Sequence, residues 1–113
     1  MIQFGTATLR KMKNYRVRIS RKAWNDIEDL ADFLLTVKDF ESARRYLDTM
    51  MAEVQSLALF ADLYRISTMA DILKYHLKAR RMASHNRRWV YIFHIEDDTV
   101  IVDRIRPSKI IAK

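Results

Sequence analysis

Residues 87–105 read RRWVYIFHIEDDTVIVDRI, which is the most regular pattern in the chain. Its first part, from Arg87 to Ile95, contains the apolar run Trp89-Val90-Tyr91-Ile92-Phe93, which is typical of a central strand covered on both faces. The acidic residues 96–98 are expected to form a hairpin turn, and a second strand runs from Thr99 to Ile105. Pro107 is expected to stop that strand, since proline has no N–H to donate to the ladder.

A basic stretch precedes this hairpin. Apolar and polar residues alternate over 74–84, which predicts a strand with Leu77 on one face and Lys78 on the other. His85-Asn86 is the predicted turn into the next strand, because asparagine tolerates the left-handed conformation that glycine would otherwise supply. Residues 74–105 are therefore expected to form a three-stranded meander.

The N-terminal half has one strand and two helices. Residues 15–20 alternate, which predicts a half-buried strand. Apolar residues then recur every three or four positions over 22–37 and 40–60, and Ser20 and Asp39 are the expected N-caps. Both apolar stripes, including Trp24 and Tyr46, are predicted to face the core. Residues 61–73 are expected to be a loop, apart from a short helical turn at 61–64.

The resulting order is β-α-α-β-β-β, which predicts an α+β fold. Because the loop between the two helices is short, they should form an antiparallel helical hairpin. This hairpin is expected to pack on one face of a mainly antiparallel four-stranded sheet. The first strand is expected to pair with the last, which would place the last strand inside the sheet.

The composition limits the classes of function. The chain has 113 residues, one glycine and no cysteine. A single domain is expected over 12–113, with 1–11 as an N-terminal extension and Met12 as an alternative start. The lack of cysteine excludes zinc fingers, iron–sulfur sites and cysteine nucleophiles, and one glycine excludes glycine-rich phosphate loops. There is no apolar run of about 18 residues and no signal-peptide pattern, so a cytoplasmic protein without a membrane partner is predicted.

The net charge of +7 is unevenly distributed. Residues 1–20 carry +5, residues 21–73 carry −4 and residues 74–113 carry +6. Such segregation favours a polyanion or an acidic partner that meets one face of the protein.

Cations of the predicted strands are the candidate binding residues. A twisted sheet is expected to gather them into one positive surface, which suits phosphate because arginine offers a planar fork and lysine a point charge. The same surface would suit an acidic peptide. The candidates for nucleic-acid or partner binding are Arg16, Arg18, Lys78, Arg80, Arg104 and Arg106.

The three histidines, at positions 76, 85 and 94, lack the spacing of metal ligands. Neither a metal nor another cofactor is therefore expected. RNA cleavage without a metal needs a base, an acid and cations that stabilise the phosphorane. His85, Arg88 and Lys109 are the candidates for these roles.

The ordered set of elements from Tyr15 to Lys109 resembles the RelE/ParE superfamily of bacterial toxins, known from plasmid stabilisation and type II toxin–antitoxin systems. The similarity rests on residues 15–20 leading into the pattern Ala23-x-x-Asp26-Ile27-x-x-Leu30-x-x-Phe33, on the second helix over 43–57, and on residues 87–105.

The resemblance implies a growth-inhibiting toxin with a cognate antitoxin as partner. It also implies one of two targets: the ribosome, where RelE-like toxins cleave mRNA, or DNA gyrase, which ParE-like toxins poison. Arg81, Arg88 and Lys109 match the cations that contact the scissile phosphate in the RelE-like branch. That branch often adds a tyrosine or histidine after the last strand, where this chain has Ser108, Lys109 and Lys113. Either His85 substitutes for that group, or the protein is not a nuclease.

Two alternatives remain open at the level of sequence. The same fold could serve as a non-catalytic nucleic-acid or ribosome binder, or as a protein-interaction domain that docks an acidic partner on its basic sheet face. Binding to phosphate should weaken steeply with added salt, with a log–log slope of about −0.9 per phosphate on duplex DNA.

Overall fold

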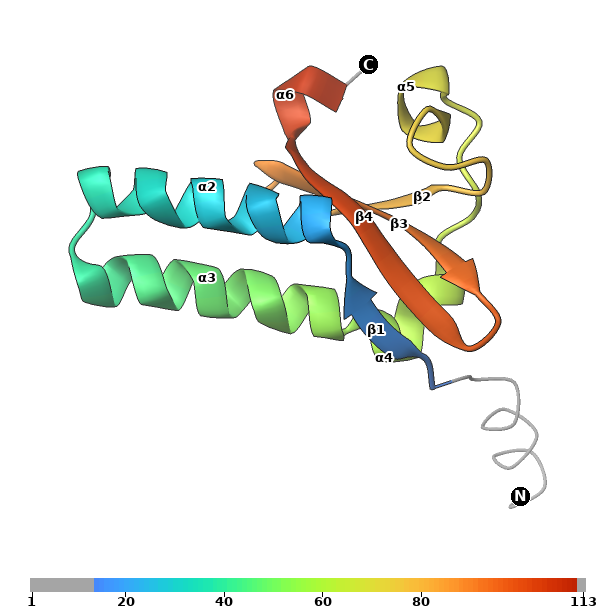
Figure 1. The fold of residues 1–113 in the computed structure, drawn as a ribbon, viewed down its shortest axis with the longest axis horizontal. Coiled ribbons are helices and arrows are strands. Elements are labelled where there is room, and N and C mark those ends of the chain that lie inside the picture. Colours follow the sequence, from blue (N-terminus) through green and yellow to red (C-terminus); the bar gives the residue numbers. More distant parts are fainter. Residues whose placement is uncertain (1–13, 112–113) are drawn as a thin grey trace.

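A four-stranded sheet of order β1-β4-β3-β2 organises the computed structural model, which describes residues 14–111 (Figure 1). Strand β1 runs parallel to β4, and the other pairs are antiparallel, so the sheet is mixed. The predicted pairing of the first strand with the last is confirmed. The strands are β1 (Arg16–Ile19), β2 (Arg80–Ala83), β3 (Trp89–Glu96) and β4 (Thr99–Pro107).

The helices confirm the predicted α+β class and order. Two long helices form the hairpin, and the others are single turns. They are α2 (Arg21–Val37), α3 (Phe40–Gln55), α4 (Leu57–Phe60), the 3-10 turn η1 (Ala61–Leu63), α5 (Ala70–Leu73) and α6 (Ser108–Ile111). No helix in the described part of the chain is long and apolar enough to cross a membrane. The predicted extension 1–11 lies outside the described residues.

Both predicted caps of the helical hairpin are present. Ser20 Oγ accepts a hydrogen bond from the Ala23 N–H at 3.1 Å, and Asp39 Oδ1 accepts one from the Ser42 N–H at 2.8 Å. The two long helices lie antiparallel, and their connection projects beyond the sheet (Figure 1). The predicted helix 40–60 is interrupted at Ser56, whose hydroxyl donates to the Glu53 carbonyl at 2.6 Å and competes with the regular backbone ladder.

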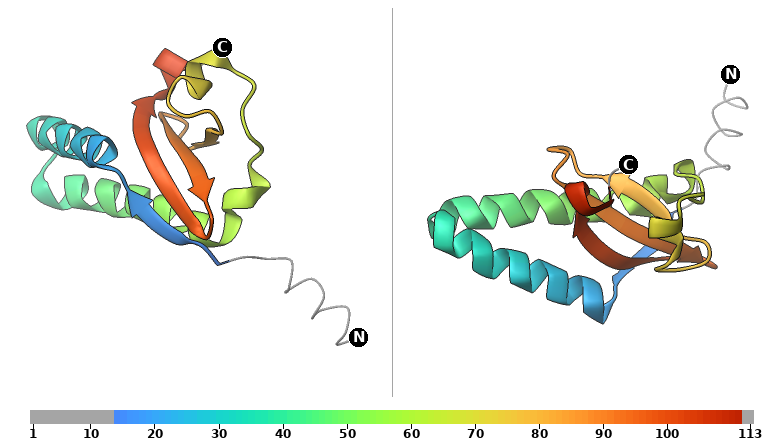
Figure 2. Two further views of the ribbon diagram at one scale, coloured as in Figure 1. Left: turned by 45° about the vertical axis from the view of Figure 1, so that its right-hand side comes forward. Right: turned by 90° about the horizontal axis from the view of Figure 1, so that it is seen from above.

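The central strand β3 is buried on both faces, as its apolar run predicts. Tyr91 and Phe93 pack in the core beneath the helical hairpin, whereas Val90 and Ile92 pack on the opposite face against Ile72. Figure 2 shows the hairpin and the segment around α5 on opposite sides of β3 and β4. The side chains of alternate residues on β3 and β4 therefore enter two separate environments.

The strand predicted over 74–84 is wrong in its first half. Only 80–83 form β2, while 74–79 make turns and leave Leu77 87% exposed. The α5 turn also lies where a loop was expected. Burial of Ile72 and Ala79 against β3 requires the chain to fold over the sheet, so tertiary packing overrides the alternation.

Two further sequence predictions need correction. Trp24 is 44% exposed. Helix α2 contacts the core through Ala23, Leu30 and Leu34, and its apolar stripe is wider than this contact surface, so Trp24 stays at the edge. The left-handed residue of the β2–β3 turn is Arg87, with φ 64°, instead of Asn86. The Asn86 side chain has another role in this turn, described below.

Candidate functional site

The turn over 84–88 is stabilised by its own side chains. Asn86 Oδ1 accepts hydrogen bonds from the Ser84 hydroxyl at 2.7 Å and from the Arg88 N–H at 2.9 Å. Ser84 Oγ in turn accepts from the Trp89 N–H at 3.0 Å. These short-range bonds are typical of asparagine and serine in turns, and they define the path of the backbone into β3.

Two side chains of α3 attach this turn to the helical hairpin. Glu53 accepts from the His85 N–H at 3.0 Å with one carboxylate oxygen and from the Tyr91 hydroxyl with the other. Tyr46 Oη accepts from Trp89 Nε1 at 2.9 Å and from Asn86 Nδ2 at 3.1 Å. Burial, followed by the hydrogen bond to Glu53, raises the pKa of Tyr91 above its ordinary value, so the phenol stays neutral. Helix α3 therefore binds the turn region through both backbone and side-chain groups.

A groove of about 970 Å³ lies beside the turn and brings two predicted site residues together. Arg88 and Lys109 both line it, because the Ser108 N–H donates to the Arg88 carbonyl at 2.9 Å and so places the start of α6 beside the turn. Arg87 lines it as well. Its left-handed backbone lets two consecutive arginines line the same groove, whereas neighbours in an extended strand would point to opposite faces.

The groove combines apolar walls with a basic rim. Phe33 and Val37 of α2 contribute apolar surface that is 58% and 60% exposed. Lys38 adds a fourth cation, and its Nζ lies 6.0 Å from the centre of the Tyr46 ring. Among the described residues that line the groove, none carries a carboxylate or an imidazole. Its chemistry suits an amphipathic, negatively charged ligand.

The other two predicted catalytic residues lie elsewhere. His85 is exposed and lines a smaller cavity of about 130 Å³ with Glu53, and Tyr46 borders both this cavity and the groove. Arg81 is paired with Ile92 in the sheet, which places it on the face opposite Tyr91, where its Nη1 lies 3.6 Å from Met69 Sδ. Arg81 and His85 are therefore not part of the Arg88–Lys109 groove.

The predicted binding cations are divided among several environments. Arg104 is bound to the carboxylate of Asp26 at 2.8 and 3.0 Å, and these hydrogen bonds raise its pKa further. Arg106 Nη1 lies 4.0 Å from the same carboxylate. Arg80 Nη1 donates to the Tyr64 carbonyl at 2.7 Å.

The remaining members of that set are exposed. Arg16 and Arg18 alternate on β1 with Val17 and Ile19, which pack against the core. The two arginines therefore face away from the helical hairpin. Lys78 lies in the loop before β2. The predicted set therefore does not form one continuous positive surface, and much of its charge is committed to internal partners.

Sequence reasoning missed the residues that hold the site. Glu53 and Asp26 are acidic positions on amphipathic helices, where a solvated carboxylate is the ordinary expectation. Tyr46 packs partly buried against the core, as its stripe predicts, and its hydroxyl also supports the turn. No local signal distinguishes these three, because their partners lie 32 to 79 residues away.

Comparison with known proteins yields a family and a fold. A family model described as the ParE toxin of the type II toxin–antitoxin system parDE matches residues 17–111. Among solved structures, a chain of the chromosomal ParDE TA system from P. aeruginosa has a TM-score of 0.68 at 17% identity. The match covers 83% of this chain and 96% of that chain, and at this identity it shows the fold alone. No curated protein sequence matches this chain.

Proposed function

The chain belongs to the ParE toxin family of type II toxin–antitoxin systems, and from this premise we propose that it arrests bacterial growth by binding DNA gyrase through the basic groove. The observation that carries the proposal is the convergence of Arg88 and Lys109 on a groove with apolar walls. We further propose that a cognate antitoxin neutralises the toxin by occupying this groove.

The chemistry of the groove favours binding over cleavage. Cleavage of RNA would need a proton acceptor and a proton donor beside the cations. Besides the cations and Ser108, one described residue of the groove lining has a side-chain group that could transfer a proton, and this residue is Tyr46. Its oxygen already accepts two hydrogen bonds, from Trp89 and Asn86. Arg81 lies on the other sheet face and cannot join a phosphate site with Arg88 there.

The antitoxin segment that fits the groove is an amphipathic helix with acidic flanks. Apolar side chains of such a helix would cover the exposed Phe33 and Val37, and its carboxylates would meet Lys38, Arg88 and Lys109. A desolvated aromatic anchor surrounded by charge pairs is the usual source of affinity in such interfaces. Because the same cations are used, antitoxin and target would exclude each other.

The deciding experiment is induction of the full chain alone in bacteria, with pulse labels for DNA and protein synthesis. The proposal expects DNA synthesis to fall first, together with a DNA-damage response. If protein synthesis falls first, with mRNA cut in translating cells, the gyrase assignment is wrong and the ribosome is the target. If soluble protein has no effect on growth, the toxin function itself is wrong. Co-expression of the antitoxin should restore growth.

A further inference from the structure

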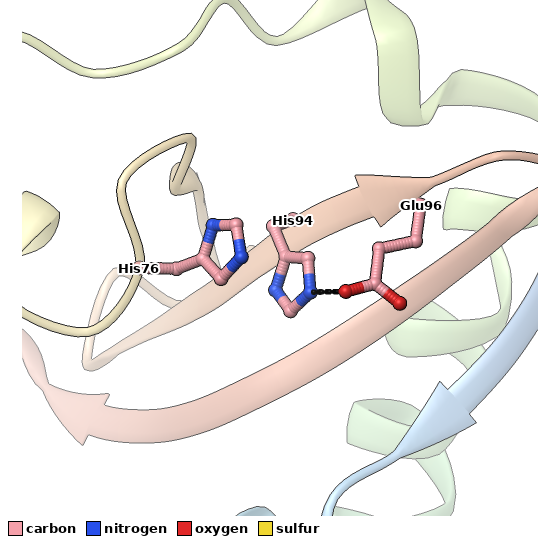
Figure 3. Close-up of side chains that lie close together, drawn as sticks. All are labelled: His76, His94 and Glu96. Carbon is pink, nitrogen blue, oxygen red and sulfur yellow. Dashed lines mark hydrogen bonds and ion pairs between the residues drawn. The ribbon is translucent and has the colours of Figure 1, made fainter.

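A second cluster of chemically active side chains lies on the other face of the sheet from the hairpin. It contains His76, from the loop between α5 and β2, and His94 and Glu96 of β3 (Figure 3). One ligand atom from each of the three lies within 4.8 Å of the others. Along β3 the side chain of His94 points to the face opposite that of Tyr91 and Phe93, which pack under the helical hairpin. None of the three cluster residues lines the groove described above.

His94 is oriented as metal-binding histidines are. Its side chain is 6% exposed, and its Nδ1 lies 2.7 Å from Asp103 Oδ2. A carboxylate at this position accepts a hydrogen bond from Nδ1–H, and in that tautomer Nε2 carries the lone pair that can bind a metal. Nε2 faces Glu96 Oε2 at 3.3 Å, and Figure 3 shows this nitrogen directed at the carboxylate.

His76 lies over the His94 ring and comes from the loop between α5 and β2. Its ring stacks on that of His94, with the centroids 3.6 Å apart and the planes at 4°. Its Nδ1 accepts a hydrogen bond from the Lys78 N–H at 3.0 Å. His76, Glu96 and Asp97 also line a cavity of about 380 Å³, so the cluster can be reached from solvent.

We propose that His76, His94 and Glu96 bind one Zn²⁺ ion, with water at the fourth position and Asp103 as the partner that orients His94. Two imidazoles, one carboxylate and a water molecule make a tetrahedral set that suits zinc. A divalent cation also compensates the two carboxylates, Asp103 and Glu96, that flank the imidazole of His94.

Zinc binding requires a local rearrangement of His76. Tetrahedral ligands at about 2.0–2.1 Å from zinc lie roughly 3.4 Å apart, whereas the ligand atoms of this cluster lie within 4.8 Å of one another. An imidazole also binds a metal in its own plane, so two parallel stacked rings cannot share one ion. His76 must therefore leave the stack on His94. It lies in the turns of 74–79, which can move without breaking a strand. The bound ion would join this loop to β3.

The test is a zinc titration of the purified full chain, without an affinity tag, by calorimetry and by competition with a chromophoric chelator. The wild-type chain should bind one Zn²⁺, and Glu96→Gln and His76→Ala should each weaken binding at least tenfold. Both positions are solvent-accessible, so these variants should fold, which circular dichroism verifies. His85→Ala is the matched control, since it removes an exposed histidine outside the cluster and should leave zinc affinity unchanged. Asp103→Asn should weaken binding about 10–100-fold.

A spectroscopic readout separates zinc binding from an alternative role of His94. Zinc should shift the amide NMR signals of residues 74–79 in the wild type but not in Glu96→Gln. If the wild-type chain binds no zinc, or if folded Glu96→Gln binds it as tightly as the wild type, the proposal is overturned. The contacts of His94 with Asp103 and Glu96 would then serve the fold alone. This proposal is independent of the toxin target, because it uses no groove residue.

Discussion

Asp26 of α2 and Arg104 of β4 form a two-point ion pair across 78 residues of sequence, with Nε–Oδ2 at 2.8 Å and Nη2–Oδ1 at 3.0 Å. Asp26 Oδ2 also accepts from the Ile105 N–H at 2.9 Å. Strand β1 pairs with β4 only as far as Val102, so the edge of β4 beyond this point lacks a neighbouring strand. Asp26 supplies the acceptor that a longer β1 would have provided.

We expect Asp26→Ala to lower the free energy of unfolding by about 1.5–3 kcal/mol, the usual range for a hydrogen bond to a charged group. The substitution leaves Arg104 and the Ile105 N–H without their acceptor. Urea denaturation followed by circular dichroism measures the change. Asp29→Ala, at an exposed position of the same helix, is the control and should have little effect. Equal midpoints for the two variants would show that the ion pair does not stabilise the fold.

Arg88→Ala and Lys109→Ala are each expected to abolish growth arrest with little loss of stability. Both side chains are exposed and line the groove, so their removal costs target contacts and few internal ones. Growth after induction, at matched protein levels, is the readout. Arg44→Ala removes an exposed cation of α3 whose pairs are with Glu41 and Asp48, and it should remain toxic. A stable Arg88→Ala protein that still arrests growth would contradict the proposed site.

Phe33→Ala should weaken binding of the cognate antitoxin by at least tenfold without lowering the melting temperature. The ring is 58% exposed on the groove wall, so it contributes more to an interface than to the core. Affinity is measured with purified toxin and antitoxin. Leu63→Ala removes a side chain that is 75% exposed outside the groove, and it should bind antitoxin normally. The same affinity for both variants would place the antitoxin elsewhere.

Glu53→Gln is expected to bring the pKa of Tyr91 back toward its ordinary value of 10.0. Burial and the Glu53 carboxylate favour the neutral phenol, so the pKa is raised in the folded state. The stabilising effect is present below pH 10 and is lost as the pH rises through the higher folded value. Ultraviolet titration of tyrosinate, compared with Tyr91→Phe, identifies the signal. No difference between wild type and Glu53→Gln would mean that burial alone is responsible.

The cap at Asp39 should make stability depend on pH in the acid range. Hydrogen bonds from the Ser42 backbone and side chain hold the pKa of Asp39 below its ordinary value of 3.8. A lowered folded pKa stabilises the protein above that ordinary value, and the contribution disappears as the pH falls through the folded pKa. Asp39→Ala should therefore melt below the wild type at neutral pH, and the two should converge in strong acid. A difference that persists in acid would assign the effect to helix propensity.

Local chemistry made much of the fold predictable. Ser20 and Asp39 mark the starts of α2 and α3 because their side chains accept the first free N–H groups of each helix. Pro107 ends β4, and the unbroken apolar run of β3 indicates burial on both faces. These features depend on neighbours a few residues away, so the sequence contains all that is needed to read them.

The tertiary structure decides which charged side chains pair within the protein and which line the groove. Arg104 is committed to Asp26, whereas Arg88 meets Lys109 in the groove, although both arginines look alike in sequence. His76 and His94 lack the spacing of metal ligands, yet folding of the loop over β3 stacks their rings. The role of a side chain depends on the groups that it contacts. For residues far apart in the chain, these contacts form only when the strand order of the sheet and the helical hairpin bring the residues together.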